Sequence, residues 1–213
     1  MELNGGIRKV DFARNYLESL KRCLDTLSLE QVAALITALE TAHQNRRHVF
    51  IVGNGGSAAT ASHMACDLNK TVNGNELHAP GQRFHVVSLA DNVPWMTAIA
   101  NDLGYDYVFS EQLHNLCESG DLLIAITGSG NSPNVVEAVK VAKSFGAKVF
   151  GILGFDGGSV RELVDEYVLV ESNHYGFIED IHMVLDHLVT AYFKDLRIRL
   201  IDPVFVEGQP SVD

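Results

Sequence analysis

Short apolar runs alternate with segments of helical periodicity along most of this chain. The runs are rich in β-branched residues and end at glycine or polar residues, a pattern typical of buried strands. They lie at 48–53, 84–90, 121–127, 148–154 and 166–172. Between and after them, apolar residues that recur every three or four positions predict helices. These helices are expected at 57–70, 93–102, 107–117, 132–146, 158–164 and 178–196.

The first part of the chain, from Val10 to Ala42, predicts mostly helix. Phe12, Tyr16 and Leu20 recur at helical spacing, and Ser28 with Gln31 forms a capping-box pattern that begins a second helix. The apolar stripes of these helices need more burial than one small sheet offers. We therefore expect the chain to form a homo-oligomer.

Strands that alternate with helices predict an α/β fold with about five strands, mostly parallel and covered on both faces. No linker-like segment divides the chain, so we expect one domain over residues 1–213. It would comprise N-terminal helices at 1–45, an α/β core at 46–197 and a tail at 198–213. The tail contains two prolines and is expected to be a loose terminus or a subunit contact.

Composition narrows the classes of function. The net charge of −11 disfavours binding to nucleic acid or to anionic membranes, because the long-range field repels polyanions. No apolar run approaches the roughly 18 residues of a membrane span, and the first residues lack the pattern of a signal peptide. Three widely spaced cysteines fit a reducing compartment, so we expect a cytoplasmic protein.

Two strand-to-helix turns, at 52–63 and 126–134, are rich in glycine and hydroxyl residues. The first amides of a helix are unpaired and lie at the positive end of its dipole, so such turns can bind a phosphate without Lys or Arg. The alternative is that they only cap helices and reverse the chain. Neither turn contains the P-loop lysine or a GxGxxG pattern, so no nucleotide cofactor is expected.

Titratable residues recur at helical spacing on two predicted helices. His63 and Asp67 are four apart, and Glu179 and His187 are eight apart, so each pair shares a face. His182 and Asp186 form a further pair, displaced around the helix. Taken alone, such pairs are more often solvated or structural. A carboxylate with an imidazole nevertheless suits aldose–ketose isomerisation, which needs a base at carbon and an acid at oxygen.

Three stretches, GNGGSA…SHMACDL, ITGSGNSPNVVEA and ESNHYGFIEDIHMVLDH, resemble the sugar isomerase (SIS) domain family, and most closely its phosphoheptose isomerase branch. The resemblance implies a flavodoxin-like SIS fold and a homotetramer with active sites at subunit interfaces. It also implies that a phosphosugar binds on the second turn, with Ser57, Thr127, Ser129 and Ser132 as the phosphate donors. The substrate-binding residues implied are Asn54, Gly55, Gly56, Ser57, Asp102, Thr127, Gly128, Ser129 and Ser132. Gly128 stands where that branch often has a hydroxyl residue.

The resemblance further implies a metal site, commonly zinc, formed by His63, Asp67, Glu179 and His187. Asp67 and His187 would be the acid–base pair, with Glu179 as a second catalytic carboxylate. Mn²⁺ or Fe²⁺ would also accept these ligands. Three departures from the family pattern stand out: Asp67 replaces a Glu, Glu179 a Gln and Phe177 an Arg.

The function expected from these patterns is a phosphosugar isomerase. Its substrate would be sedoheptulose 7-phosphate, converted to D-glycero-D-manno-heptose 7-phosphate, or a close relative, with proton transfer through an enediol. The alternative is a non-catalytic tetramer that binds phosphosugars or proteins, as the replication-initiator-associating members of the family do. The departures at Asp67 and Phe177 keep that alternative open.

Overall fold

A computed structural model describes residues 8–74 and 81–201 and contains one five-stranded sheet. The strands are β1 (His48–Val52), β2 (His85–Ser88), β3 (Leu122–Thr127), β4 (Lys148–Gly154) and β5 (Glu166–Val170). The helices are α1 (Lys9–Asp25), α2 (Leu29–Gln44), α3 (Gly56–Asn69), α4 (Val93–Asp102), α5 (Ser110–Leu116), α6 (Pro133–Ser144), α7 (Gly158–Leu163) and α8 (Tyr175–Ile201). Two 3-10 turns, η1 (Thr71–Asn73) and η2 (Tyr105–Tyr107), complete the described elements.

All neighbouring strands are parallel, in the order β2-β1-β3-β4-β5. The chain leaves β1 for β2 on one side and then returns to place β3 on the other. This is the doubly wound order of flavodoxin-like folds, in which ligands bind where the strand order reverses. The two glycine-rich turns follow β1 and β3, so both lie at that crevice.

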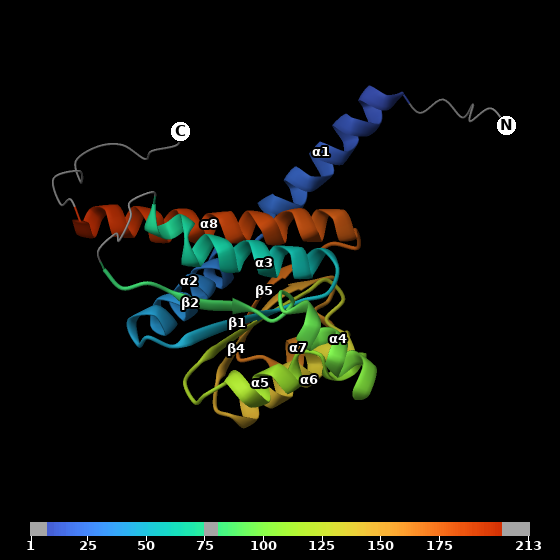
Figure 1. The fold of residues 1–213 in the computed structure, drawn as a ribbon. Coiled ribbons are helices and arrows are strands. Elements are labelled where there is room, and N and C mark those ends of the chain that lie inside the picture. Colours follow the sequence, from blue (N-terminus) through green and yellow to red (C-terminus); the bar gives the residue numbers. More distant parts are fainter. Residues whose placement is uncertain (1–7, 75–80, 202–213) are drawn as a thin grey trace.

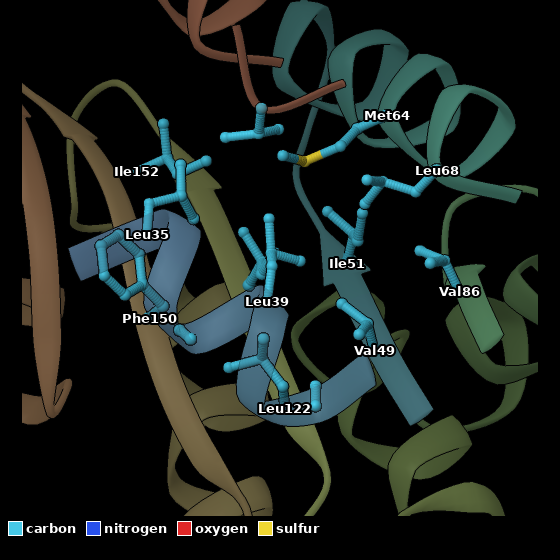
Figure 2. Packing of buried hydrophobic residues seen from close by; sticks show 14 of the residues in the cluster. Leu35, Leu39, Val49, Ile51, Met64, Leu68, Val86, Leu122, Phe150 and Ile152 are labelled. Carbon is cyan, nitrogen blue, oxygen red and sulfur yellow. The ribbon is translucent and has the colours of Figure 1, made fainter. Parts of the chain in front are cut away.

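Helices cover both faces of the sheet, as expected from the alternating pattern. Figure 1 shows α2, α3 and α8 on one face and α4 to α7 on the other. Side chains of β3 alternate between the two cores: Leu122 and Ile124 face the first group, and Leu123 and Ala125 face the second. Figure 2 shows the first core, where Leu35 and Leu39 of α2 and Met64 of α3 pack over the sheet.

The N-terminal helices differ in how they are held. Ser28 begins α2 as predicted, because its hydroxyl accepts a hydrogen bond from the Gln31 amide. The Gln31 side chain instead accepts from the Leu169 amide of β5, which ties α2 to the sheet. By contrast, α1 projects from the body of the molecule, and it has no buried residue (Figure 1).

The predicted order of strands and helices is confirmed, with small shifts at the ends. The predicted helix at 107–117 is η2 followed by α5, and the last helix begins earlier and ends later than 178–196. The tail expected from residue 198 starts as the last turn of α8, and residues 202–213 lie outside the described part. Within the described residues, no helix combines the length and apolar content of a membrane span.

Candidate active site

The turn after β1 brings α3 close to the sheet. Gly55 precedes α3 with φ 56°, a conformation that favours glycine. A Cβ atom on Gly53 would lie 2.7 Å from the backbone of Ser57, so only glycine allows the first turn of α3 to fold back onto the strand end. Ser57 itself is buried.

Asn54 links the turn after β1 to the turn after β3. Its side-chain amide donates to the Asn134 side chain at 2.8 Å, and Asn134 donates back to Asn54 at 2.8 Å. The Tyr105 hydroxyl also donates to the Asn54 oxygen. Asn134 is buried at the start of α6, so this reciprocal amide pair fixes the two turns relative to each other.

The carboxylate of Glu179, a residue of α8, lies against the first turn at Gly56. A Cβ atom on Gly56 would overlap the Glu179 carboxylate, which therefore lies against the start of α3. The amino end of a helix attracts negative charge, so this position suits a carboxylate. An anionic ligand at the same turn would meet that charge.

The turn after β3 is held mainly by its own polar groups. The Thr127 hydroxyl accepts from the Gly130 amide, and the Ser129 hydroxyl accepts from the Asn131 amide. Asn131 accepts in turn from the amide and the hydroxyl of Ser159 at the start of α7. The Thr127 and Ser129 hydroxyls act as acceptors in these bonds, so each retains its proton for a ligand.

Two features leave the second turn ready for an anion. Ser132 begins α6, and its side chain makes no hydrogen bond to the helix backbone. Gly128 faces the ring of Tyr175: an added Cβ would lie 3.0 Å from that ring. This contact gives a physical reason for glycine at position 128, since Tyr175 occupies the space of a side chain.

α3 and α8 run side by side in the same direction (Figure 1), and they bring three predicted residues together. The Nε2 atoms of His63 and His187 lie 3.2 Å apart, although the residues are 124 positions apart in the chain. Asp67 lies 3.5 Å from His63 Nε2, and the Thr71 hydroxyl donates to its other oxygen at 2.8 Å. The His63 side chain is 48% exposed, so this group is open to solvent.

A fourth titratable side chain, Asp186, joins this group. Ligand atoms of His63, Asp67, Asp186 and His187 all lie within 4.8 Å of one another. Glu179, the predicted fourth ligand, lies outside this group, beside Gly56. Burial, followed by the negative charge of Asp67, raises the pKa of Asp186 to about 7, and the Thr190 hydroxyl opposes the shift.

His182 lies one turn before Asp186 on the buried face of α8. Its Nε2 donates to the Leu153 carbonyl of β4 at 3.2 Å, which leaves Nδ1 without a partner in the described residues. Burial lowers the pKa of His182 to about 4, although the bond to Leu153 acts in the opposite direction. The ring is therefore neutral at pH 7 and anchors α8 to the sheet.

Two other residues singled out in the sequence have local contacts. Asp102 is the exposed last residue of α4 and accepts a hydrogen bond from the Asn101 side chain, so no described interaction joins it to either turn. Phe177 stacks on His174 and packs edge-on against Tyr16 of α1. It therefore helps to hold α1, where the Tyr16 hydroxyl also donates to Asp180.

Sequence reasoning gave too little weight to Asp186 and Asn134. A signal for Asp186 was present, because the apolar stripe of α8 runs through Ile178, Ile181, Leu185 and Val189, and a charged residue interrupts that face. No comparable signal marked Asn134. An asparagine after a serine and a proline is ordinary at the start of a helix, and its partner lies 80 positions away.

Comparisons with known proteins identify the family and the fold of this chain. The model of the SIS domain family matches residues 11–154. A phosphoheptose isomerase of Aliarcobacter butzleri is 38% identical over 172 residues, which are 81% of this chain and 88% of that protein. One of Campylobacter concisus is 42% identical over 146 residues, 68% of this chain and 75% of that protein. The solved structure of a phosphoheptose isomerase from Neisseria gonorrhoeae matches with a TM-score of 0.78 at 29% identity, covering 88% of this chain and 98% of its own.

Proposed function

This chain belongs to the SIS domain family, and we propose that it is a phosphosugar isomerase acting on sedoheptulose 7-phosphate or a close relative. The product would be D-glycero-D-manno-heptose 7-phosphate or its counterpart. One observation carries the proposal: His63, Asp67 and His187 converge between α3, which begins at the first turn, and α8, whose Glu179 lies against that beginning. Relatives of this chain that carry the name phosphoheptose isomerase support the same reaction.

The second turn is proposed to hold the phosphate. Thr127, Ser129 and Ser132 supply hydroxyl donors, and the amino end of α6 adds its unpaired amides. The backbone at Gly128 can approach a ligand closely because it has no side chain. Asn54, Gly55, Gly56 and Ser57 of the first turn, with Asp102, remain proposed substrate contacts, and the carboxylate of Glu179 favours sugar hydroxyls over phosphate there.

Proton transfer is proposed to use the carboxylates and His187. A base must remove the proton from the carbon next to the carbonyl, and an acid must protonate the oxygen. Thr71 holds one oxygen of Asp67, which leaves the other facing the two imidazoles. Asp67 and Glu179 are the candidate bases, and His187 is the candidate acid.

A divalent metal ion, most simply Zn²⁺, is proposed to bind His63, Asp67 and His187. The residues fit such an ion: tetrahedral bonds of 2.0–2.1 Å place two ligand nitrogens about 3.3 Å apart, close to the observed 3.2 Å. A bound ion would polarise the substrate carbonyl. Holding an ion through Nε2 and donating a proton from Nε2 exclude each other at His187, so metal content decides which of these roles it has.

A homotetramer in the cytoplasm is part of the proposal. Phe12 and Leu17 of α1 are 61% and 63% exposed, and apolar side chains on a projecting helix favour association with other subunits. The three cysteines are free, which fits a reducing compartment. Light scattering of the full chain checks the assembly: a monomer would contradict it.

The test of function is direct. The purified chain is incubated in D₂O with ketose phosphates of five to eight carbons, and NMR follows product formation and exchange of the protons at C1 and C2. We expect turnover and exchange to be fastest with the seven-carbon substrate. Asp67→Ala and Glu179→Ala variants identify the base, because loss of that residue should abolish exchange. An inert protein that still binds the sugar phosphates would support the non-catalytic scaffold, which its named relatives do not favour.

A further inference from the structure

Asp186 is a buried carboxylate without a partner. Its side chain is fully buried on the inner face of α8, with 0% exposed. Neither of its oxygens makes a hydrogen bond of ordinary geometry with the described residues. One turn away on either side, His182 and Thr190 are buried as well: Nδ1 of His182 lacks a partner in the described residues, and the Thr190 hydroxyl lies near Asp186 without a hydrogen bond of ordinary geometry.

A buried charge without a counter-charge is costly, so an ionised carboxylate in this position needs a compensating charge, and without one the group binds a proton instead. The residues around Asp186 indicate which kind of group could supply that compensation. Asp67 and the ring nitrogens of His63 and His187 converge with Asp186 within 4.8 Å. Among the described residues, no Lys or Arg forms an ion pair with Asp186, so a hydrogen-bonded ion pair does not supply the compensation there.

We propose that Asp186 is a ligand of the divalent cation, completing a set of two imidazoles and two carboxylates with His63, Asp67 and His187. This inference rests on the proposed function and identifies a ligand that the resemblance does not imply. The two carboxylates together carry a charge of −2, which a divalent ion neutralises. Such a mixed nitrogen and oxygen set suits Zn²⁺, Mn²⁺ or Fe²⁺.

The burial of the four residues shows how they surround one point. His63 and His187 are exposed, Asp67 is half-buried and Asp186 is buried. The imidazoles therefore approach from the solvent side and Asp186 from the core side. Glu179 approaches from neither, because its carboxylate lies against Gly56. Eight residues of helix rise about 12 Å, so Glu179 begins two turns away from His187, whereas Asp186 is its neighbour.

Metal affinity tests the assignment without any need for activity. The metal-free full chain competes with a chromophoric chelator for Zn²⁺, and the Asp186→Asn variant is compared with Glu179→Gln and Asp180→Asn. Asn keeps the size of Asp186 and removes its charge, and urea unfolding confirms that the variant folds. We expect Asp186→Asn to weaken binding by at least about 10-fold. The two control variants should stay within about twofold of the unmodified chain.

A gain of signal provides the second measurement. With Co²⁺, an Asp186→Cys variant should show a thiolate-to-metal charge-transfer band that is absent from the unmodified chain and from Asp180→Cys. Unchanged Zn²⁺ affinity of Asp186→Asn, with binding still lost in His187→Ala, would overturn the assignment and leave the proposed function standing. Failure of the unmodified chain to bind any divalent ion would overturn both the assignment and the metal part of the proposed function.

Discussion

The turns after β1 and β3 have nearly the same composition, yet their surroundings differ. At the first turn, glycines allow α3 to pack against the strand end and against Glu179 of α8. At the second, Thr127 and Ser129 support the loop, and Ser132 keeps its hydroxyl free of the helix backbone. The first turn thus positions the helix that carries His63, whereas the second presents donors. Glycine and serine in a strand-to-helix turn can therefore serve helix packing or ligand binding.

The largest expected effect compares one glycine from each turn. Gly130 has φ 65°, and a Cβ there would overlap the Gly157 carbonyl oxygen. Gly130→Ala combines an overpacking cost of roughly 1–3 kcal/mol with about 1–2 kcal/mol for the left-handed conformation. Gly55→Ala suffers only the second cost, because nothing lies within 4 Å of its added Cβ. Urea unfolding should show the greater loss for Gly130→Ala, and equal losses would contradict the tighter packing of the second turn.

The next effect concerns the hydrogen bond from His182 of α8 to the Leu153 carbonyl of β4. Leu153 is in register with Thr127 of the second turn. The pKa of His182 is lowered from its ordinary value of 6.5 to about 4, so the unfolded chain binds more protons between these values. Stability present above pH 6.5 should therefore fall as the pH drops towards 4, with about 2.5 kcal/mol lost by pH 4.5. Urea unfolding at pH 7.5 and 4.5 measures the loss, and His182→Gln should show a smaller difference. An identical pH dependence in both proteins would show that His182 does not titrate as argued.

A smaller effect tests the packing of the first turn. The change in the free energy of unfolding caused by Gly56→Ala should reverse its sign when the Glu179 side chain is removed. Gly56→Ala should cost about 1 kcal/mol, the low end of the overpacking range, because the new Cβ meets the flexible end of the Glu179 side chain, which can move aside. In a Glu179→Ala background that obstacle is gone, and Gly→Ala within a helix is favourable by about 1 kcal/mol. A double-mutant cycle from urea unfolding should therefore show strong coupling. Additive effects would mean that Glu179 does not pack against Gly56.

The smallest expected effect compares how much a serine from each turn contributes to binding a phosphorylated ligand. Ser132→Ala should raise the KM for a phosphorylated ketose about 10-fold, because a hydrogen bond to a charged group contributes roughly 1.5–3 kcal/mol. Ser57→Ala should change it less, since the carboxylate of Glu179 lies against Gly56, the residue before Ser57, and repels an anion there. Steady-state kinetics with both variants measures the difference. A larger effect from Ser57→Ala would assign the phosphate to the first turn.

Much of the fold was predictable because each strand and helix has its own local pattern. The runs that became β1 and β3 are short, apolar and β-branched, and Ser28 caps α2 as its spacing predicts. The meeting of His63, Asp67 and His187 was expected from the family resemblance, and the structure brings them together. The surroundings of Glu179 and Asp186 could not be predicted in the same way. They depend on how α3 and α8 are placed against each other, which no local spacing specifies.

The reciprocal amide pair of Asn54 and Asn134 has a consequence for selectivity. Each side chain donates to and accepts from the other, so a shift of either turn would break both hydrogen bonds at once. The pair thereby fixes the start of α6, which is proposed to hold the phosphate, relative to the turn from which α3 carries His63. Under the proposed function, this fixed geometry would favour sugars of one chain length, because a sugar one carbon too short, bound by its phosphate, would hold its carbonyl further from His63.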